Sequence, residues 1–258
     1  MVIDMTKLGL LMICVMLSGD CIGSDAGIRH SEMQAAAGKA SSRAYLERRI
    51  REHHSQSLRT GSTKAEGRVE MITLAEHPDS AATMAPLASG VQARTRGVIE
   101  VDNDAIPTIA SLLEGVASRS GREMERRIFH DVVSIEGTAI GAAELLSIEP
   151  TGVISRERST GAVRTYNVPG LGIVVLSEDN YIESGTVITL VEETMNTDVN
   201  GYPARSYAAR TKDGRGKAEV RWVTPTKSYW MTLVSDDGGR IEQGEPTLMH
   251  VARAISSK

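Results

Sequence analysis

Histidines are the first residues in this 258-residue chain to examine for metal or acid–base chemistry. The six are His30, His53, His54, His77, His130 and His250. No H-E-x-x-H or H-x-x-x-H spacing occurs, so no two of them share one face of a single helix. His53 and His54 are adjacent and would point about 100° apart on a helix, so they cannot bind one ion together. We therefore expect no metal site and no cofactor.

Carboxylates occur in close pairs at three places, Asp102/Asp104, Glu192/Glu193 and Asp236/Asp237. Each pair falls in a turn or at a strand end, whereas acid–base catalysis needs a cleft that separates the two pKa values. Asp102–Asp104 resembles the start of a calcium loop, but the required glycine and downstream glutamate are missing. No G-x-S-x-G, P-loop or G-x-G-x-x-G motif is present. The sequence predicts a protein without catalytic residues; an enzyme would require His130 or His250 to meet carboxylates in a cleft.

Three aromatic residues are the candidate contact site for a partner. Trp222 and Trp230 flank a Thr-Pro-Thr turn in the predicted hairpin 218–234, and Tyr229 lies beside the second of them. Tryptophan and tyrosine are enriched at the energetic centres of protein interfaces. They also pack cores, and only 3% of this chain is aromatic. Partner binding by Trp222, Tyr229 and Trp230 is the functional hypothesis, and core packing is the alternative.

Composition restricts the class of protein further. Apolar residues make up 41% of the chain and charged residues 24%, as in ordinary globular proteins. The net charge is −4, which gives no indication of nucleic-acid binding. The scarcity of aromatic residues argues against an aromatic-lined pocket for sugars or bases.

The N-terminus has the pattern of a secretory signal peptide over residues 1–23. Lys7 precedes an apolar run of about ten residues, which is too short to span a bilayer. Translation could start at Met1 or Met5, and cleavage could follow Gly23 or Ala26. Because both cysteines lie in or beside this run, cleavage leaves no cysteine for a disulfide, a metal or a nucleophile. A periplasmic or secreted location is expected.

Lipidation of Cys21 is the alternative fate of this segment. Asp20 occupies the position where a lipobox has glycine or alanine, so the match to that motif is incomplete. Association with a membrane is expected only if Cys21 is lipidated.

The remaining chain predicts a basic helical linker over 24–66 and an α+β domain over 67–258. Period-two alternation and frequent turn signals predict antiparallel sheets. The predicted strands are 67–74, 98–101, 127–136, 142–149, 152–157, 162–168, 172–176, 186–192, 204–210, 218–223 and 228–234. Two packed helices are expected, one after Asp104 and one over Glu245–Ile255. Similar patterns around Val133 and Val199 raise the alternative of two similar halves, 67–176 and 177–258.

The order of these elements resembles one known class of domain. A Ser111-Leu-Leu-Glu-Gly-Val helix follows a short strand, and Val199-Asn-Gly201 leads into a strand. A tryptophan-bearing strand at Glu219–Trp222 and a closing helix complete the pattern. It is similar to the C-terminal domain of periplasmic immunity proteins that neutralise lipase effectors of type VI secretion, over about residues 95–258. Exported Mog1/PsbP-like domains have a similar order.

The resemblance implies a stoichiometric inhibitor that blocks a secreted toxin and needs no catalytic residues. We therefore expect an exported binding protein of the cell envelope with a protein partner. An envelope-assembly or lipid-carrier module is the alternative. A sheet-lined cavity of about 300–1,000 Å³ would favour the carrier. A filled core with an exposed acidic or aromatic face would favour the immunity protein.

Overall fold

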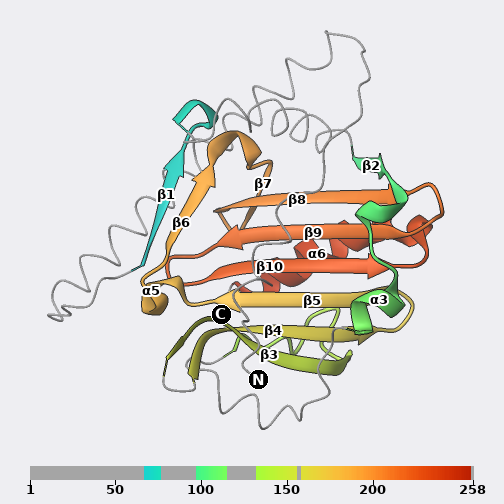
Figure 1. Ribbon diagram of the computed structural model, residues 1–258, viewed down its shortest axis with the longest axis horizontal. Helices are drawn as coiled ribbons and strands as arrows, with labels where there is room; N and C mark the ends of the chain where they lie inside the picture. Colours follow the sequence, from blue (N-terminus) through green and yellow to red (C-terminus); the bar gives the residue numbers. More distant parts are fainter. Residues whose placement is uncertain (1–66, 77–96, 115–131, 156–157, 257–258) are drawn as a thin grey trace, which may run out of the picture.

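The computed structural model describes residues 67–76, 97–114, 132–155 and 158–256, which are coloured in Figure 1. The predicted signal peptide 1–23 and linker 24–66 lie outside these residues, as do His77 and His130. None of the helices that the structure describes is both long enough and apolar enough to span a bilayer.

One large sheet of eight strands dominates the described part of the chain (Figure 1). Its strand order is β2 (Val98–Val101), β8 (Tyr202–Thr211), β9 (Gly216–Val223), β10 (Ser228–Ser235), β5 (Gly172–Asp179), β4 (Arg158–Val168) and β3 (Glu144–Ser155), while β7 (Thr197–Val199) also pairs with β8. The pairs are antiparallel except β2 with β8, which is parallel.

A smaller parallel sheet joins β1 (Arg68–Ile72) to β6 (Val187–Val191). The described helical segments are η2 (Leu74–Glu76), η3 (Asn103–Ala105), α3 (Ile109–Glu114), α5 (Tyr181–Ser184), η4 (Glu192–Thr194), η5 (Gly238–Arg240) and α6 (Ile241–Ile255). The predicted α+β class is confirmed.

Helix α6 packs against β8, β9 and β10 and covers one side of the large sheet. Its predicted apolar residues Leu248, Val251, Ala252 and Ile255 are all buried. The helix begins before the predicted Glu245 because η5 runs directly into it at Ile241. Gly244 allows close approach to the sheet, since a Cβ there would lie 2.5 Å from Cδ2 of Leu233. We call this side of the sheet the helix face.

The pleat of β9 separates two kinds of side chain. Ala218, Val220 and Trp222 belong to the core on the helix face. Because successive strand residues point to opposite sides, Lys217, Glu219 and Arg221 lie on the other side, which we call the polar face. One end of the polar face is covered by apolar residues of α3 and of the segment between η3 and α3, which form a small core with the sheet. Its residues include Ile106, Ile109, Leu112, Ala209 and Val234.

Two strand predictions between residues 127 and 157 are wrong. Residues 132–136, the described part of the predicted strand 127–136, form an irregular segment and a turn. There the Val133 amide donates to the buried carboxylate of Glu178 at 3.0 Å. The side chain of Val133 packs against the core on the helix face. The predicted strands 142–149 and 152–157 are one strand, β3, in which a bulge with Gly152 at φ 74° replaces the expected break.

The suggested boundary between two halves, after residue 176, falls inside β5. Strands from both halves also pair with one another, since β10 pairs with β5 and β6 pairs with β1. The large sheet is therefore assembled from both halves together.

Gly172 provides a test of how tightly β5 and β10 are joined. Its φ is 134°, and a Cβ there would lie 2.2 Å from the Val234 carbonyl oxygen. We expect Gly172→Ala to lower the free energy of unfolding by about 3 kcal/mol, because both the backbone and the neighbouring strand must shift. Chemical denaturation of the full chain measures this.

Gly214→Ala is the matched control for that substitution. Its φ is 93°, but no atom lies within 4 Å of the added Cβ. It should cost only the backbone strain, about 1 kcal/mol. Equal losses for the two variants would contradict the close approach of β10 to Gly172.

Candidate functional site

The structure places two of the three predicted contact residues together in the core. Trp222 is 3% exposed and Tyr229 is 8% exposed. Their rings stack on the helix face with centroids 4.8 Å apart and planes 11° apart. The Trp222 indole Nε1 also donates to Oγ of Ser256 at 2.8 Å, just beyond the end of α6. These contacts hold the C-terminal end of the helix against the sheet.

Trp230, the third predicted residue, lies on the polar face, because it alternates with Tyr229 along β10. The guanidinium carbon of Arg221 lies 3.5 Å from the centre of its ring, a close cation–π contact. Arg221 and Trp230 are cross-strand partners in β9 and β10. The side chain of Arg221 is 38% exposed, so part of this pair is accessible to solvent.

Glu219 is the centre of the polar groups around this pair. Its side chain is only 2% exposed, and Nε of Arg221 donates to its Oε1 at 2.6 Å. Nζ of Lys217 lies 3.1 Å from Oε2, and Nη2 of Arg205 lies 3.7 Å from Oε1. The hydroxyl of Tyr207 donates to Oε2 at 3.2 Å. We call these residues together with Trp230 the Glu219 cluster.

Two neighbouring strands position the charges of the cluster. Lys217, Glu219 and Arg221 are two residues apart along β9 and so share one side of the sheet. Arg205 and Tyr207 stand directly opposite Arg221 and Glu219 on β8. Sequence reasoning missed this cluster, although the alternation of Lys-x-Glu-x-Arg with Ala218, Val220 and Trp222 was a signal that could have revealed it.

The charges of the cluster stabilise one another. Burial by itself would raise the pKa of Glu219, but Arg221, Lys217 and Arg205 together lower it below its usual value. Burial would lower the pKa of Lys217, yet the nearby Tyr207 and Glu219 raise it. Burial, followed by the charge of Glu219, raises the pKa of the Tyr207 hydroxyl. At neutral pH the cluster therefore holds three cations and one carboxylate.

A second buried ion pair lies within the core, between β4 and β5. Nη2 of Arg164 is 3.5 Å from Oε2 of Glu178, and their side chains are 6% and 0% exposed. Glu178 also accepts from the amide of Val133. This pair fixes the irregular segment 132–136 to the sheet, which is a structural role.

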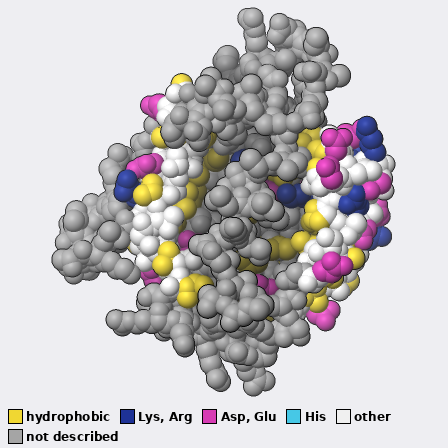
Figure 2. Space-filling model, viewed as in Figure 1, with side chains coloured by type: hydrophobic (Ala, Val, Ile, Leu, Met, Phe, Trp, Pro, Cys, Tyr) yellow, Lys and Arg dark blue, Asp and Glu magenta, His cyan; other side chains and the backbone are white. Residues whose placement is uncertain are grey.

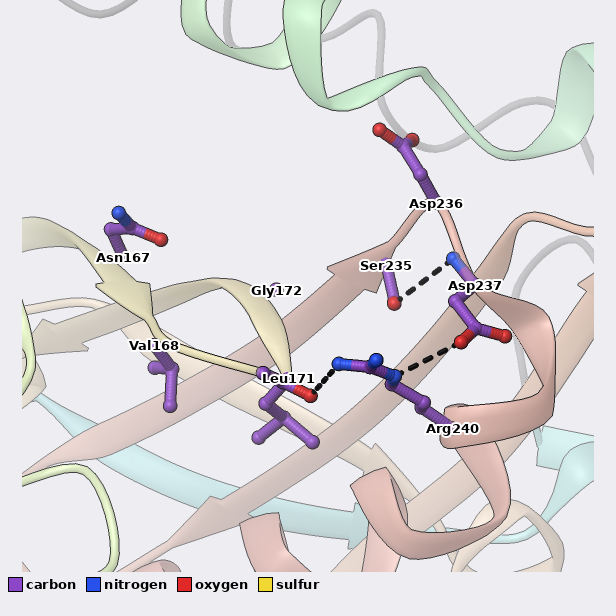
Figure 3. Close-up of a pocket in the computed structure, with 9 residues that line it drawn as sticks. Asn167, Val168, Leu171, Gly172, Ser235, Asp236, Asp237 and Arg240 are labelled. Carbon is purple, nitrogen blue, oxygen red and sulfur yellow. Dashed lines mark hydrogen bonds and ion pairs between the residues drawn. The ribbon is translucent and has the colours of Figure 1, made fainter.

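The described residues form an open depression of about 380 Å³ where the β4–β5 turn meets the end of β10 (Figure 3). Arg240 lies across it, donating to the Gly170 carbonyl and, at 2.9 Å, to Oδ2 of Asp237. Asp237, Ser235 and Asn167 contribute polar groups to its lining, beside the apolar side chains of Val168 and Leu171. The depression lies at the ends of β4, β5 and β10 and in the turns that adjoin them.

Asp102 and Asp104 are exposed around η3, whereas one carboxylate of each of the other two predicted pairs accepts a backbone hydrogen bond. Asp236 accepts from the amide of Ile109 at the start of α3, and Glu193 accepts from the amide of Leu74 at 2.8 Å. His250 is exposed on α6. Across the described residues, no group of three or more histidines, cysteines or carboxylates is placed to hold a metal ion.

Charged side chains also gather at the end of the sheet where β8 turns into β9, on the right in Figure 2. Arg215 in this turn donates to the Asn103 carbonyl at 2.6 Å and to Asp213 at 2.6 Å. Hydrogen bonds from Arg215 and then Thr211 lower the pKa of Asp213 to about 2. These bonds hold η3 against the turn.

The two tryptophans should differ strongly in their contribution to stability. Trp222→Ala removes a buried, stacked ring and should lower the free energy of unfolding by about 4 kcal/mol. Trp230→Ala removes a partly buried ring and one cation–π contact, and should cost about 1 kcal/mol. Urea denaturation of both variants checks this, and a larger loss for Trp230→Ala would contradict their placement on opposite sides of the sheet.

Glu219→Gln tests the charge of the cluster. Removing the carboxylate leaves three cations close together and should cost about 3 kcal/mol at pH 7. Because folding lowers the pKa of Glu219, its stabilisation is complete above the pKa of the unfolded chain, about 4.3. This stabilisation is lost as the pH falls through the pKa of Glu219 in the folded protein. The difference in unfolding free energy between wild type and variant should therefore shrink below pH 4.

Glu144→Gln is the control for that experiment, because Glu144 is exposed on β3. It should have little effect at either pH. A Glu219→Gln defect of equal size at pH 3 and pH 7 would show that shape, and not charge, makes Glu219 important.

No protein-family model matches the sequence, no curated protein matches it, and no solved structure matches its fold. The resemblance to periplasmic immunity domains therefore stays a prediction.

Proposed function

We propose that this chain is a non-catalytic, exported binding protein of the cell envelope that binds a protein partner through the polar face of its large sheet. The observation that carries this proposal is the Arg221–Trp230 pair, which is partly exposed and held rigidly in the Glu219 cluster. Arginine and tryptophan are the residues most enriched at the energetic centres of protein interfaces. A rigid pair also loses little conformational entropy on binding.

The location of Trp222 and Tyr229 narrows the proposed contact region. Both are buried beneath α6, so they support the sheet from its other side. The contact region is thus Trp230 with Arg221 and the residues around them. A periplasmic immunity protein, which blocks a secreted toxin stoichiometrically, is the class of function that we favour for this surface.

The test is capture of partners from the envelope and secreted fractions of the organism that makes this protein. Wild type and a Trp230→Ala variant, both as the full chain, serve as baits, and captured proteins are identified by mass spectrometry. We expect one stoichiometric partner that wild type retains and that Trp230→Ala loses at least ten-fold.

Leu145→Ala is the matched control, because Leu145 is 43% exposed on the edge strand β3, which β4 and β5 separate from β10. It should capture the partner as well as wild type does. A co-purifying lipid without a protein partner would overturn the proposal in favour of the carrier, and so would capture that does not depend on Trp230. Recovery of the chain only from the cytoplasm would overturn its export.

A further inference from the structure

We infer that the Glu219 cluster binds a carboxylate from an acidic segment of the partner protein, with the Arg221 guanidinium as its main ligand. This inference rests on the proposed function and deepens it, because it names the chemistry of the partner. It is carried by the opposed positions of Arg205 and Arg221, by the geometry of Arg221 and by an unsatisfied donor on Trp230.

Two arginines of the cluster face each other across neighbouring strands. Arg205 and Arg221 are directly opposite each other on β8 and β9. Like charges in that arrangement repel and destabilise a sheet. Oε1 of Glu219 contacts both arginines, but the same carboxylate also pairs with Lys217. Glu219 thus divides its charge among three cations, and an anion beside the partly exposed guanidinium of Arg221 would relieve its repulsion with Arg205.

Arg221 is held in a geometry suited to that anion. Its Nε bonds to Glu219, and its guanidinium lies against the Trp230 ring, so two contacts fix its plane. Within the residues that the structure describes, its two terminal nitrogens make no hydrogen bond or ion pair. A planar guanidinium presents two parallel N–H groups that match the two oxygens of a carboxylate.

Trp230 provides an independent observation. Its indole Nε1 is buried and has no hydrogen-bond partner. Buried donors are almost always satisfied in folded proteins, because leaving one unpaired is costly. An unpaired donor next to a partly exposed guanidinium is expected of a surface whose polar groups are completed by a partner.

The cluster favours a carboxylate over a phosphate. Glu219 lies at its centre and would repel a doubly charged phosphate more strongly than a singly charged carboxylate. The cluster also already binds one carboxylate through Arg221, which shows that its donors suit this group. The proposed occupant is therefore a peptide segment bearing aspartate or glutamate.

The test uses the two indole N–H signals in the NMR spectrum of the ¹⁵N-labelled full chain, which has two tryptophans. A Trp230→Phe variant assigns them. The probe is an acetylated, amidated peptide of sequence Gly-Glu-Gly-Glu-Gly, and the control peptide has glutamine in place of glutamate. We expect the Glu peptide to shift the Trp230 signal and the Gln peptide to leave it unchanged. The Trp222 signal should not move, since that ring lies in the core.

Arg221→Lys keeps the positive charge but removes the two parallel N–H groups. It should raise the Kd of the Glu peptide about ten-fold. Arg253→Lys, on the exposed side of α6, is the matched control and should leave the Kd unchanged. The position of the Trp222 signal in each variant reports whether the core is intact. The comparison of Glu and Gln peptides on wild type needs no variant at all.

Three results would overturn the inference. They are an unmoved Trp230 signal at millimolar Glu peptide, equal Kd values for Arg221→Lys and Arg253→Lys, and tighter binding of inorganic phosphate or phosphatidylglycerol vesicles than of the Glu peptide. If the Glu peptide does not bind but a partner is captured in a way that requires Trp230, the inference is wrong and the proposed function stands. Binding of the Glu peptide with no Trp230-dependent partner would reject the proposed function alone.

Discussion

The packing of α6 on β8, β9 and β10 determines which side chains of the large sheet lie on its helix face and which lie on its polar face. Because the helix requires an apolar surface, Ala218, Val220 and Trp222 must face it. The pleat then commits Lys217, Glu219 and Arg221 to the opposite side. A slip of one residue in β9 would bury three charges under the helix, so the core that stabilises the fold also fixes the Glu219 cluster in place. Stability and the proposed binding surface thus depend on the same register.

The two buried carboxylates show how each side of the sheet uses charge. Glu178 lies on the helix face, is fully enclosed, forms an ion pair with Arg164 and accepts a hydrogen bond from the amide of Val133. Glu219 lies on the polar face and organises cations whose ends are partly exposed. An enclosed pair specifies which backbone segment packs beside it, whereas the cluster on the polar face leaves part of the Arg221 side chain exposed. This difference in surroundings is why we assign a structural role to Glu178 and propose a role in recognition for Glu219.

Several elements were predictable because their signals are local. Period-two alternation indicated β1, β2, β9 and β10, and the spacing of Leu248, Val251 and Ile255 indicated α6. The failures depend on distant contacts. The alternation of Val133 and Ile135 resembles a strand, but Glu178, 45 residues away, takes the Val133 amide. Sequence likewise could not separate the roles of the aromatic residues, since Tyr229 and Trp230 are adjacent and only the position of α6 decides which of them is buried.

The connectivity of the first two strands has a consequence for the timing of folding. β1 and β2 each pair, in parallel, with strands that follow them by more than a hundred residues. Neither can find its place until most of the chain has left the ribosome, and pairings of such long range form slowly. A polypeptide with this connectivity stays open during its own synthesis. That delay would suit the export proposed above, in which a chain is threaded unfolded through a translocation channel before its sheet closes.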